Sequence, residues 1–353
     1  MAQRSAITWT EFTMNSLYGC SQCSPGCSNC YARRYLLRFA GTEVQNRDGR
    51  FDGLVRTREV NGEQVCSLTG RILFNPAHLY GSLGSKPKRV FVNAFSDLLH
   101  EILPLELVME HFRVFAHAPQ HIFQVLTKRG DRLAEVNEAV LAEFGKWPPN
   151  VWMGVSVCTA DDREMVRIHQ LAETAATLRW VSFEPWQSDP YRPLRIVRPA
   201  LGALLRQCNI GWVVVGGESG GHQDTALMTL DDARFLLQEG KAAGCCVFFK
   251  QLGTALAIRL DVYSTRGKGE HRSQGAHPDQ WPPDLNIQEY PEVPAVAPPA
   301  PSGFRPSFDT KTWMHFTRGT VTANEPSLNG GGSEGCGVAV GRMSVSRLPG
   351  EES

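Results

Sequence analysis

From residue 89 onward, short apolar runs alternate with longer amphipathic stretches. The apolar runs are rich in Val, Phe, Ile and Trp and end in polar or turn residues, as buried strands do. They lie at residues 89–95, 121–127, 150–157, 178–185, 211–219 and 246–251. Between them, apolar residues recur at three- and four-residue spacing, which predicts helices at residues 103–118, 161–176 and 229–244. Strand-then-helix units without hairpin dipeptides predict parallel strands joined by helical crossovers.

This repeat predicts an α/β fold built as a partial or complete (β/α) barrel. An earlier strand around Ala6–Thr10 would add a seventh strand to the six apolar runs. An open doubly wound sheet is the alternative. The barrel is favoured because no G-x-G-x-x-G fingerprint follows the first expected strand.

Two stretches lie outside the repeat. Residues 41–88 are rich in Gly, Asp, Arg and Asn and are expected to form an insertion in a barrel domain of residues 1–292. Residues 293–353 begin with a proline- and alanine-rich linker and continue with few core-forming residues. We therefore expect this tail to be disordered.

Composition and charge narrow the class of protein. Hydrophobic residues make up 42% of the chain, as in soluble globular proteins. Lys+Arg and Asp+Glu both number 36, so net charge gives no sign of a nucleic-acid or membrane partner. No run of about 18 apolar residues predicts a membrane span. The N-terminal stretch has no signal-peptide pattern, and ten cysteines are too few for a disulfide scaffold. We expect a cytoplasmic protein.

Polar residues recur where the expected strands end. In (β/α) barrels the chemistry lies at these carboxyl ends. A helix cap or an ion pair is an equally good explanation for any single residue, but the repetition over successive strands points to a functional mouth. The candidates are Asp97, His100, Glu101, Lys128, Ser156, Glu184, Gly216, Gly217, Glu218 and Lys250.

Four cysteines lie within the stretch GCSQCSPGCSNCYARR, at Cys20, Cys23, Cys27 and Cys30. Zinc sites usually use two C-x2-C pairs separated by a dozen or more residues. Here only three residues separate the pairs, so the two cannot fold independently. Iron–sulfur clusters are often ligated by closely spaced cysteines of one loop. The spacing therefore favours an iron–sulfur cluster over zinc.

Cys23, Cys27 and Cys30 have the C-x3-C-x2-C spacing of the radical S-adenosylmethionine motif, and the aromatic Tyr31 follows them. Three ligands leave one iron open, which is typical of a reactive centre rather than a structural one. In that superfamily, the motif follows the first strand of a partial (β/α) barrel.

The match is closer to one family. GCSQCSPGCSNCYARR, RVFVNAFSDLLHE, FQVLTKR, NVWMGVSV, RWVSFEP, WVVVGGESG and FFKQLG occur in this order. Over Ile7 to Glu292 the chain resembles the three-cysteine-motif proteins of phages, prophages and actinobacteria, which are radical-S-adenosylmethionine-like and distantly similar to spore photoproduct lyase. Their pattern G-C-x6-C-x2-C-Y-A selects Cys20, Cys27 and Cys30 and makes Cys23 an addition. With all four bound, the cluster would be closed.

The resemblance implies a [4Fe-4S] cluster and S-adenosylmethionine, a 5′-deoxyadenosyl radical, and a reductant such as flavodoxin or ferredoxin. It also makes nucleic acid, or a modified nucleotide, the substrate class to test. We hypothesise that Asp97 holds the amino group of the cofactor. The other expected cofactor-binding residues are Tyr31, Ser156, Gly216, Gly217, Glu218 and Lys250, and the expected catalytic residues are His100, Glu101, Lys128 and Glu184.

A second interpretation stays open at this point. The chain could be a non-enzymatic protein in which a closed four-cysteine zinc or iron–sulfur site supports a surface for nucleic acid or another partner. The sequence does not decide between the two, and it says nothing about oligomeric state.

Overall fold

The computed structural model describes residues 3–42, 46, 49–60, 62–220, 225–262, 275–292 and 304–324. Within them the largest sheet has eight strands in the order β1-β2-β7-β8-β9-β10-β11-β12. The pairs from β2 to β12 are parallel, and β1 pairs with β2 in the antiparallel sense. The strands are β1 (Gln3–Arg4), β2 (Phe12–Met14), β7 (Arg89–Val92), β8 (Ile122–Thr127), β9 (Val151–Ser156), β10 (Arg179–Trp186), β11 (Ile210–Gly217) and β12 (Cys246–Gln251).

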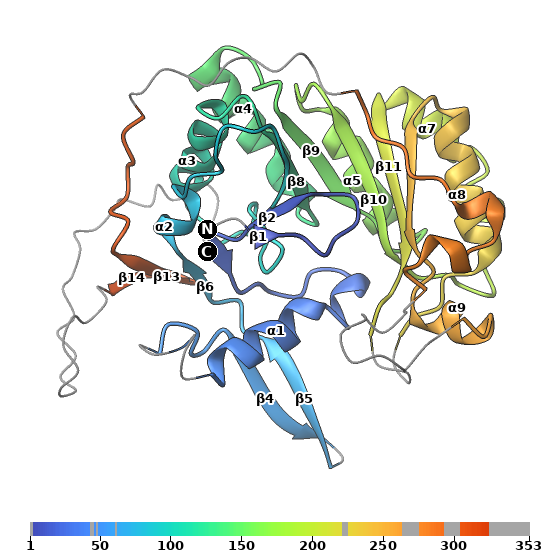
Figure 1. The fold of residues 1–353 in the computed structure, drawn as a ribbon, viewed down its shortest axis with the longest axis horizontal. Coiled ribbons are helices and arrows are strands. Elements are labelled where there is room, and N and C mark those ends of the chain that lie inside the picture. Colours follow the sequence, from blue (N-terminus) through green and yellow to red (C-terminus); the bar gives the residue numbers. More distant parts are fainter. Residues whose placement is uncertain are drawn as a thin grey trace, which may run out of the picture.

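Figure 1 shows this sheet as a curved half-barrel with helices along its outer face. The covering helices are α3 (Leu105–Ala116), α4 (Leu133–Phe144), α5 (Asp162–Ala172), α7 (Leu201–Gln207) and α8 (Leu230–Ala242). Shorter helices are α2 (Pro76–Leu79), α6 (Leu194–Val197), α9 (Thr254–Arg259), η1 (Pro25–Cys27), η2 (Gly130–Arg132), η3 (Pro278–Gln280) and η4 (Pro283–Leu285). The predicted parallel fold is confirmed as a partial barrel, because β12 and β1 are not paired with each other within the described residues.

Tryptophans fill the concave side of the sheet. Trp152, Trp180 and Trp212 are at most 1% exposed and lie in one cluster with Trp9. The ring centroids of Trp9 and Trp180 are 5.3 Å apart in an edge-to-face arrangement. The interior of the half-barrel is therefore packed with side chains among the described residues.

The first expected strand is misplaced. Residues 6–10 form turns, and the first parallel strand is β2, three residues long. The apolar character of the earlier stretch comes from Trp9, whose ring is 2% exposed and packs inside the barrel on Phe91. A single buried side chain in a turn gives a local apolar pattern that resembles the pattern of a buried strand.

A second sheet runs in the order β14-β13-β6-β3. It joins β3 (Leu17–Tyr18) and β6 (Ile72–Phe74) to β13 (Trp313–Thr317) and β14 (Thr320–Asn324). The expectation of a disordered tail from residue 293 is therefore wrong for residues 313–324, since β13 gains backbone partners on β6. Residues 293–303 and 325–353 lie outside the described residues, so the tail boundary stays a prediction there.

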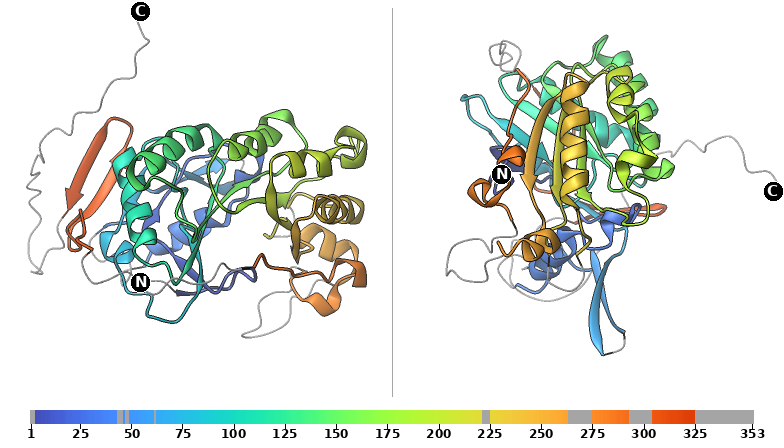
Figure 2. Two further views of the ribbon diagram at one scale, coloured as in Figure 1. Left: turned by 90° about the horizontal axis from the view of Figure 1, so that it is seen from above. Right: turned by 90° about the vertical axis from the view of Figure 1, so that its right-hand side faces the viewer.

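The insertion at residues 41–88 carries a hairpin of β4 (Val55–Val60) and β5 (Glu63–Leu68), which packs on α1 (Tyr31–Ala40). The hairpin projects from the body in both Figure 1 and Figure 2. No helix of the described residues combines the length and the apolar composition that a membrane crossing needs.

Candidate functional site

A cavity of about 220 Å³ opens at the carboxyl ends of the parallel strands. It lies between the loop that carries the cysteines and the ends of β7 to β12. Of the residues singled out from the sequence, Cys23, His100, Glu101 and Gly216 do not line it. The others do: Cys20, Cys27, Cys30, Tyr31, Asp97, Lys128, Ser156, Glu184, Gly217, Glu218 and Lys250.

Two glycines allow the cysteine loop to pack closely on its neighbours. Gly19 follows β3 with φ +95°, and a Cβ there would lie 2.1 Å from the carbonyl oxygen of Arg71. A Cβ on Gly26 would lie 2.2 Å from the Sγ of Cys158, at the end of β9. A larger side chain at Gly19 would push the loop away from Arg71, and one at Gly26 would push it away from the end of β9. The loop then enters α1 directly after Cys30.

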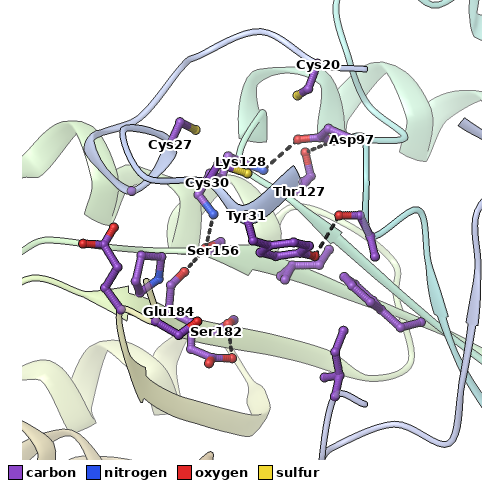
Figure 3. Close-up of a pocket in the computed structure, with 18 of the residues that line it drawn as sticks. Cys20, Cys27, Cys30, Tyr31, Asp97, Thr127, Lys128, Ser156, Ser182 and Glu184 are labelled. Atoms are coloured by element: carbon purple, nitrogen blue, oxygen red, sulfur yellow. Dashed lines mark hydrogen bonds between the residues drawn. The ribbon is translucent and has the colours of Figure 1, made fainter. Parts of the chain in front are cut away.

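Cys20, Cys27 and Cys30 all line the cavity, together with Lys128 (Figure 3). Cys23 is exposed and is not part of the lining. No three His, Cys, Asp or Glu side chains of the described residues gather closely enough for a single metal ion. An extended cluster does not need that, because each thiolate of a cubane reaches a different corner. The choice between Cys20 and Cys23 as a third ligand stays a prediction.

Two cations lie beside these thiols. Arg129 donates from Nη1 to the Sγ of Cys20 at 3.6 Å, and Lys128 donates from Nζ to the Oγ of Ser156 at 2.7 Å. Burial raises the pKa of the Cys20 thiol to about 12, and Arg129 only partly offsets this. A hydrogen bond from Cys23 lowers the pKa of Cys27, and Lys128 lowers it further. The cations can therefore balance part of the negative charge that thiolates would bring.

Asp97 is 6% exposed and its carboxylate is fully engaged. Oδ1 accepts from the hydroxyl of Thr127 at 2.8 Å and from the backbone N–H of Leu99 at 3.0 Å. Oδ2 accepts from the backbone N–H of Lys128 at 3.1 Å and from Nη1 of Arg129 at 3.0 Å. Burial alone would raise the pKa of Asp97, but Arg129 and these donors lower it. Asp97 lines the cavity mainly as the anchor of Arg129.

His100 and Glu101 lie behind the cysteine loop instead of in the cavity. The hydroxyl of Ser21 contacts Nε2 of His100 at 2.9 Å and donates to Glu101 at 3.1 Å. Arg129 donates to Glu101 at 2.6 Å and to the Ser21 hydroxyl at 2.8 Å. Burial, together with Arg129, lowers the pKa of His100 to about 4. The two residues expected to act as an acid–base pair thus brace the segment next to Cys20.

The far wall of the cavity carries an ion pair. Oε1 of Glu184 is 2.9 Å from Nζ of Lys250. Its Oε2 accepts from the indole N–H of Trp9 and from the hydroxyl of Ser182, both at 3.3 Å. A Cβ on Gly216 would lie 2.6 Å from Oε1 of Glu184, so a glycine there leaves room for the carboxylate.

Glu218 differs from Asp97 and Glu184 because only one of its two carboxylate oxygens accepts hydrogen bonds within the described residues. It is 3% exposed, and its Oε2 accepts from the backbone N–H of Ala226 at 2.6 Å and from Asn29 at 3.3 Å. Its Oε1 has no hydrogen-bond partner in the part of the chain described. A buried carboxylate oxygen without a donor is costly. It is therefore suited to a ligand that brings one.

Asn93 offers the complementary group; it is a polar residue at a strand end, to which the sequence analysis gave no individual role. It ends β7 with φ +60° and is 2% exposed. Its Oδ1 accepts from the backbone N–H groups of Ser16 and Leu17, at 2.9 Å and 3.0 Å. Its Nδ2, at the cavity wall, has no partner among the described residues. An Asn at a strand end is a common turn signal, which hid this role.

A sequence model described as "Protein of unknown function (DUF5131)" matches residues 4–282. No curated protein matches the chain. Among solved structures, the chain is similar to spore photoproduct lyase complexed with dinucleoside spore photoproduct, at 10% identity and a TM-score of 0.37. A mutant of that enzyme with bound AdoMet and dinucleoside spore photoproduct gives 10% identity and a TM-score of 0.39. Each match covers 68% of this chain and spans 63% of the other chain's length.

Proposed function

The chain belongs to the DUF5131 family, and we propose that it is an iron–sulfur enzyme of the radical S-adenosylmethionine type. One observation carries the proposal. Cys20, Cys27 and Cys30 line one cavity at the carboxyl ends of a parallel half-barrel, while Cys23 lies outside it. Three thiolates facing a cavity leave one corner of a [4Fe-4S] cluster open to a ligand.

The donor set fits such a cluster. Cys20, Cys27 and Cys30 would hold it, and Arg129 and Lys128 would balance its charge from within the protein. A single zinc ion fits less well, because no three ligands of the described residues gather around one point. When bound, the cluster and S-adenosylmethionine supply one-electron cleavage of a sulfonium to a 5′-deoxyadenosyl radical.

Glu218 and Asn93 are the groups that we assign to the cofactor's amino-acid end. The unpartnered Oε1 of Glu218 can accept from an ammonium, and the unpartnered Nδ2 of Asn93 can donate to a carboxylate. Asp97, our first hypothesis for the ammonium, has all its acceptor positions occupied by four donors. Its proposed role is instead to hold Arg129 beside Cys20.

The remaining cavity residues would orient the substrate and exclude water. Glu184 and Lys250 form the polar wall, and Trp9 closes the floor between them and the barrel interior. Tyr31 fixes the edge of the cavity by donating its hydroxyl to the carbonyl of Ala94 at 2.7 Å. A nucleic acid or a modified nucleotide stays the substrate class that we propose to test first. Membership of the phage three-cysteine family also stays a prediction.

The test is anaerobic reconstitution with iron and sulfide, followed by metal analysis, spectroscopy and a cleavage assay. We expect a brown protein with about four irons per chain, and release of 5′-deoxyadenosine when dithionite and S-adenosylmethionine are added. A colourless protein that binds one zinc would contradict the proposal and favour the non-enzymatic interpretation with a closed four-cysteine site.

The two candidate third ligands provide a matched pair of variants. Cys20→Ala should lose most of the iron, because Cys20 lines the cavity. Cys23→Ala should keep the iron and the absorbance of the cluster, because Cys23 is exposed and lies outside the lining. The reverse result would assign the third ligand to Cys23 and would overturn the set of Cys20, Cys27 and Cys30.

A further inference from the structure

Helix α1 begins directly after Cys30 and has an unusual outer face. Three of the nine large hydrophobic side chains that are exposed within the described residues lie on this one helix: Tyr31, Tyr35 and Leu37, at 38%, 42% and 40%. Arg34 and Arg38 of the same helix are also exposed. We call these five residues the α1 surface. Buried Ala32 and Leu36 fix the opposite side of the helix to the protein.

The charge of the α1 surface has one sign. The helix sequence YARRYLLRFA holds three arginines and no acidic residue, although Lys+Arg and Asp+Glu are equal over the whole chain. Neither Arg34 nor Arg38 has an ion-pair partner in the ranges that the structure describes, and Arg38 lies over the ring of Tyr35 at 4.9 Å. Exposed aromatic residues combined with Arg and without Asp, Glu or Lys are typical of the centre of a protein interface.

The position of the α1 surface suggests what it binds. Tyr31 both belongs to this surface and lines the cavity beside Cys30. The loop before the helix is open to solvent at Gln22, Cys23 and Ser28. Figure 1 shows α1 below the half-barrel, between the strands and the β4–β5 hairpin. A partner seated on α1 would therefore come close to the cysteine thiols without entering the cavity.

We propose that the α1 surface is the docking site for an acidic one-electron carrier protein of the flavodoxin class. This inference rests on the proposed function, because an iron–sulfur cluster at the cysteines is what would accept the electron. The anionic flavin hydroquinone gives up one electron and becomes the neutral semiquinone. No proton moves, and the thiolate-held iron centre is reduced by that electron. Arg34 and Arg38 supply the attraction, and Tyr35 and Leu37 supply the apolar contact.

The first test measures electron transfer. Reconstituted protein is mixed anaerobically with a flavodoxin hydroquinone in a stopped-flow instrument, and the second-order rate constant is followed against ionic strength. Arg34→Glu/Arg38→Glu should lower this constant about tenfold or more at low salt, with the difference shrinking as salt rises. Arg163→Glu/Arg195→Glu, which reverses two exposed arginines on α5 and α6, should change it less than twofold. Excess dithionite should reduce all three proteins to the same extent.

A second double variant, Arg34→Gln/Arg38→Gln, removes both charges without reversing them and controls for disruption of the helix. It should give an intermediate rate constant and an unchanged iron content. An unchanged rate constant in both α1 variants would overturn the proposal. So would a dimer that the charge reversal dissociates in light scattering, since a second copy would then cover this face. The proposal would also be overturned if the α1 variants lost oligonucleotide binding but were still reduced by flavodoxin at the parent rate.

A binding experiment separates this inference from the proposed function. Titration of the protein with oxidised flavodoxin, followed by calorimetry, needs no cluster. Binding that Arg34→Glu/Arg38→Glu weakens at least tenfold supports the α1 surface even in a protein that takes up no iron. A protein that cleaves S-adenosylmethionine with dithionite but binds no flavodoxin keeps the proposed function and removes the docking site.

Discussion

Asp97 and Glu218 line the same cavity, but their carboxylates are held in different ways. Asp97 accepts four hydrogen bonds, and the Arg129 that it holds also contacts Glu101 and Cys20. Glu218 accepts two, and one of its oxygens has no partner within the described residues. The first carboxylate is part of the framework that places the cysteines, and the second is available to a ligand. A position at the cavity wall does not by itself distinguish these two roles. The number of hydrogen bonds that each carboxylate accepts does.

The largest effect is expected from Asp97→Asn. Arg129 is 5% exposed and would lose one of its two carboxylate partners, which breaks a buried ion pair. We expect the free energy of unfolding in urea to fall by about 3 kcal/mol. Glu11→Gln is the control, because Glu11 pairs with Arg89 at an exposed position and should cost under about 1 kcal/mol. Equal losses in the two variants would remove the framework role of Asp97.

Acid should weaken the Asp97 side of the cavity through His100. The folded-state pKa of His100 is lowered to about 4, first by burial and then by Arg129, while the unfolded chain titrates at the ordinary value of 6.5. The unfolded state therefore binds more protons between these values. The contribution of neutral His100 to the free energy of unfolding is complete above pH 6.5. It is lost as the pH falls towards 4, by an amount of the order of 3 kcal/mol.

Urea unfolding at several pH values checks this expectation. His100→Asn should flatten the fall in stability between pH 6.5 and 4, and His117→Asn, at an exposed position, should leave it as in the parent protein. Half-buried His78 and buried His111 also have a pKa lowered to about 4, and both keep part of the slope in both variants. A slope that His100→Asn does not change would show that His100 carries no part of it.

In contrast to Asp97→Asn, Glu218→Gln should have a small effect on the free energy of unfolding and a larger effect on cofactor binding. The amide keeps an oxygen that can accept from the backbone N–H of Ala226, so unfolding should change by less than about 1 kcal/mol. The affinity for S-adenosylmethionine, measured by equilibrium dialysis, should fall about tenfold to a hundredfold with the loss of a charge-assisted hydrogen bond. Glu289→Gln, far along the chain on the surface, is the matched control. Unchanged affinity would assign the ammonium to another group.

The parallel sheet was predictable because its strands are long and apolar. All six apolar runs became strands of the half-barrel, and the three amphipathic stretches became α3, α5 and α8. The first strand was placed wrongly, because β2 has only three residues and Trp9 gave a strand-like signal nearby. The second sheet could not be predicted, since β3 and β6 have only two and three residues and β6 pairs with β13, more than two hundred residues further along the chain.

The candidate site was predictable as a set of strand-end residues, but the role of each residue was not. Most of the predicted residues line one cavity, because parallel strands bring their carboxyl ends together. His100 and Glu101 do not, since they turn towards Ser21 behind the cysteine loop. Only side-chain geometry shows that Asp97 is saturated and that Glu218 is not. The cysteine spacing left Cys20 and Cys23 as alternatives for the third ligand. Cys20 lines the cavity and Cys23 does not, and the assignment of Cys20 stays a proposal.

The second sheet has a consequence for how the protein matures in the cell. Strand β3 leads straight into Gly19 and Cys20, and its sheet is completed by β13 and β14 at residues 313–324. The support beneath the first cysteine is therefore assembled from the two ends of the described chain. A nascent chain on the ribosome exposes all four thiols long before that support exists. On the proposed function, a cluster that needs this support can be inserted only after translation has passed Asn324.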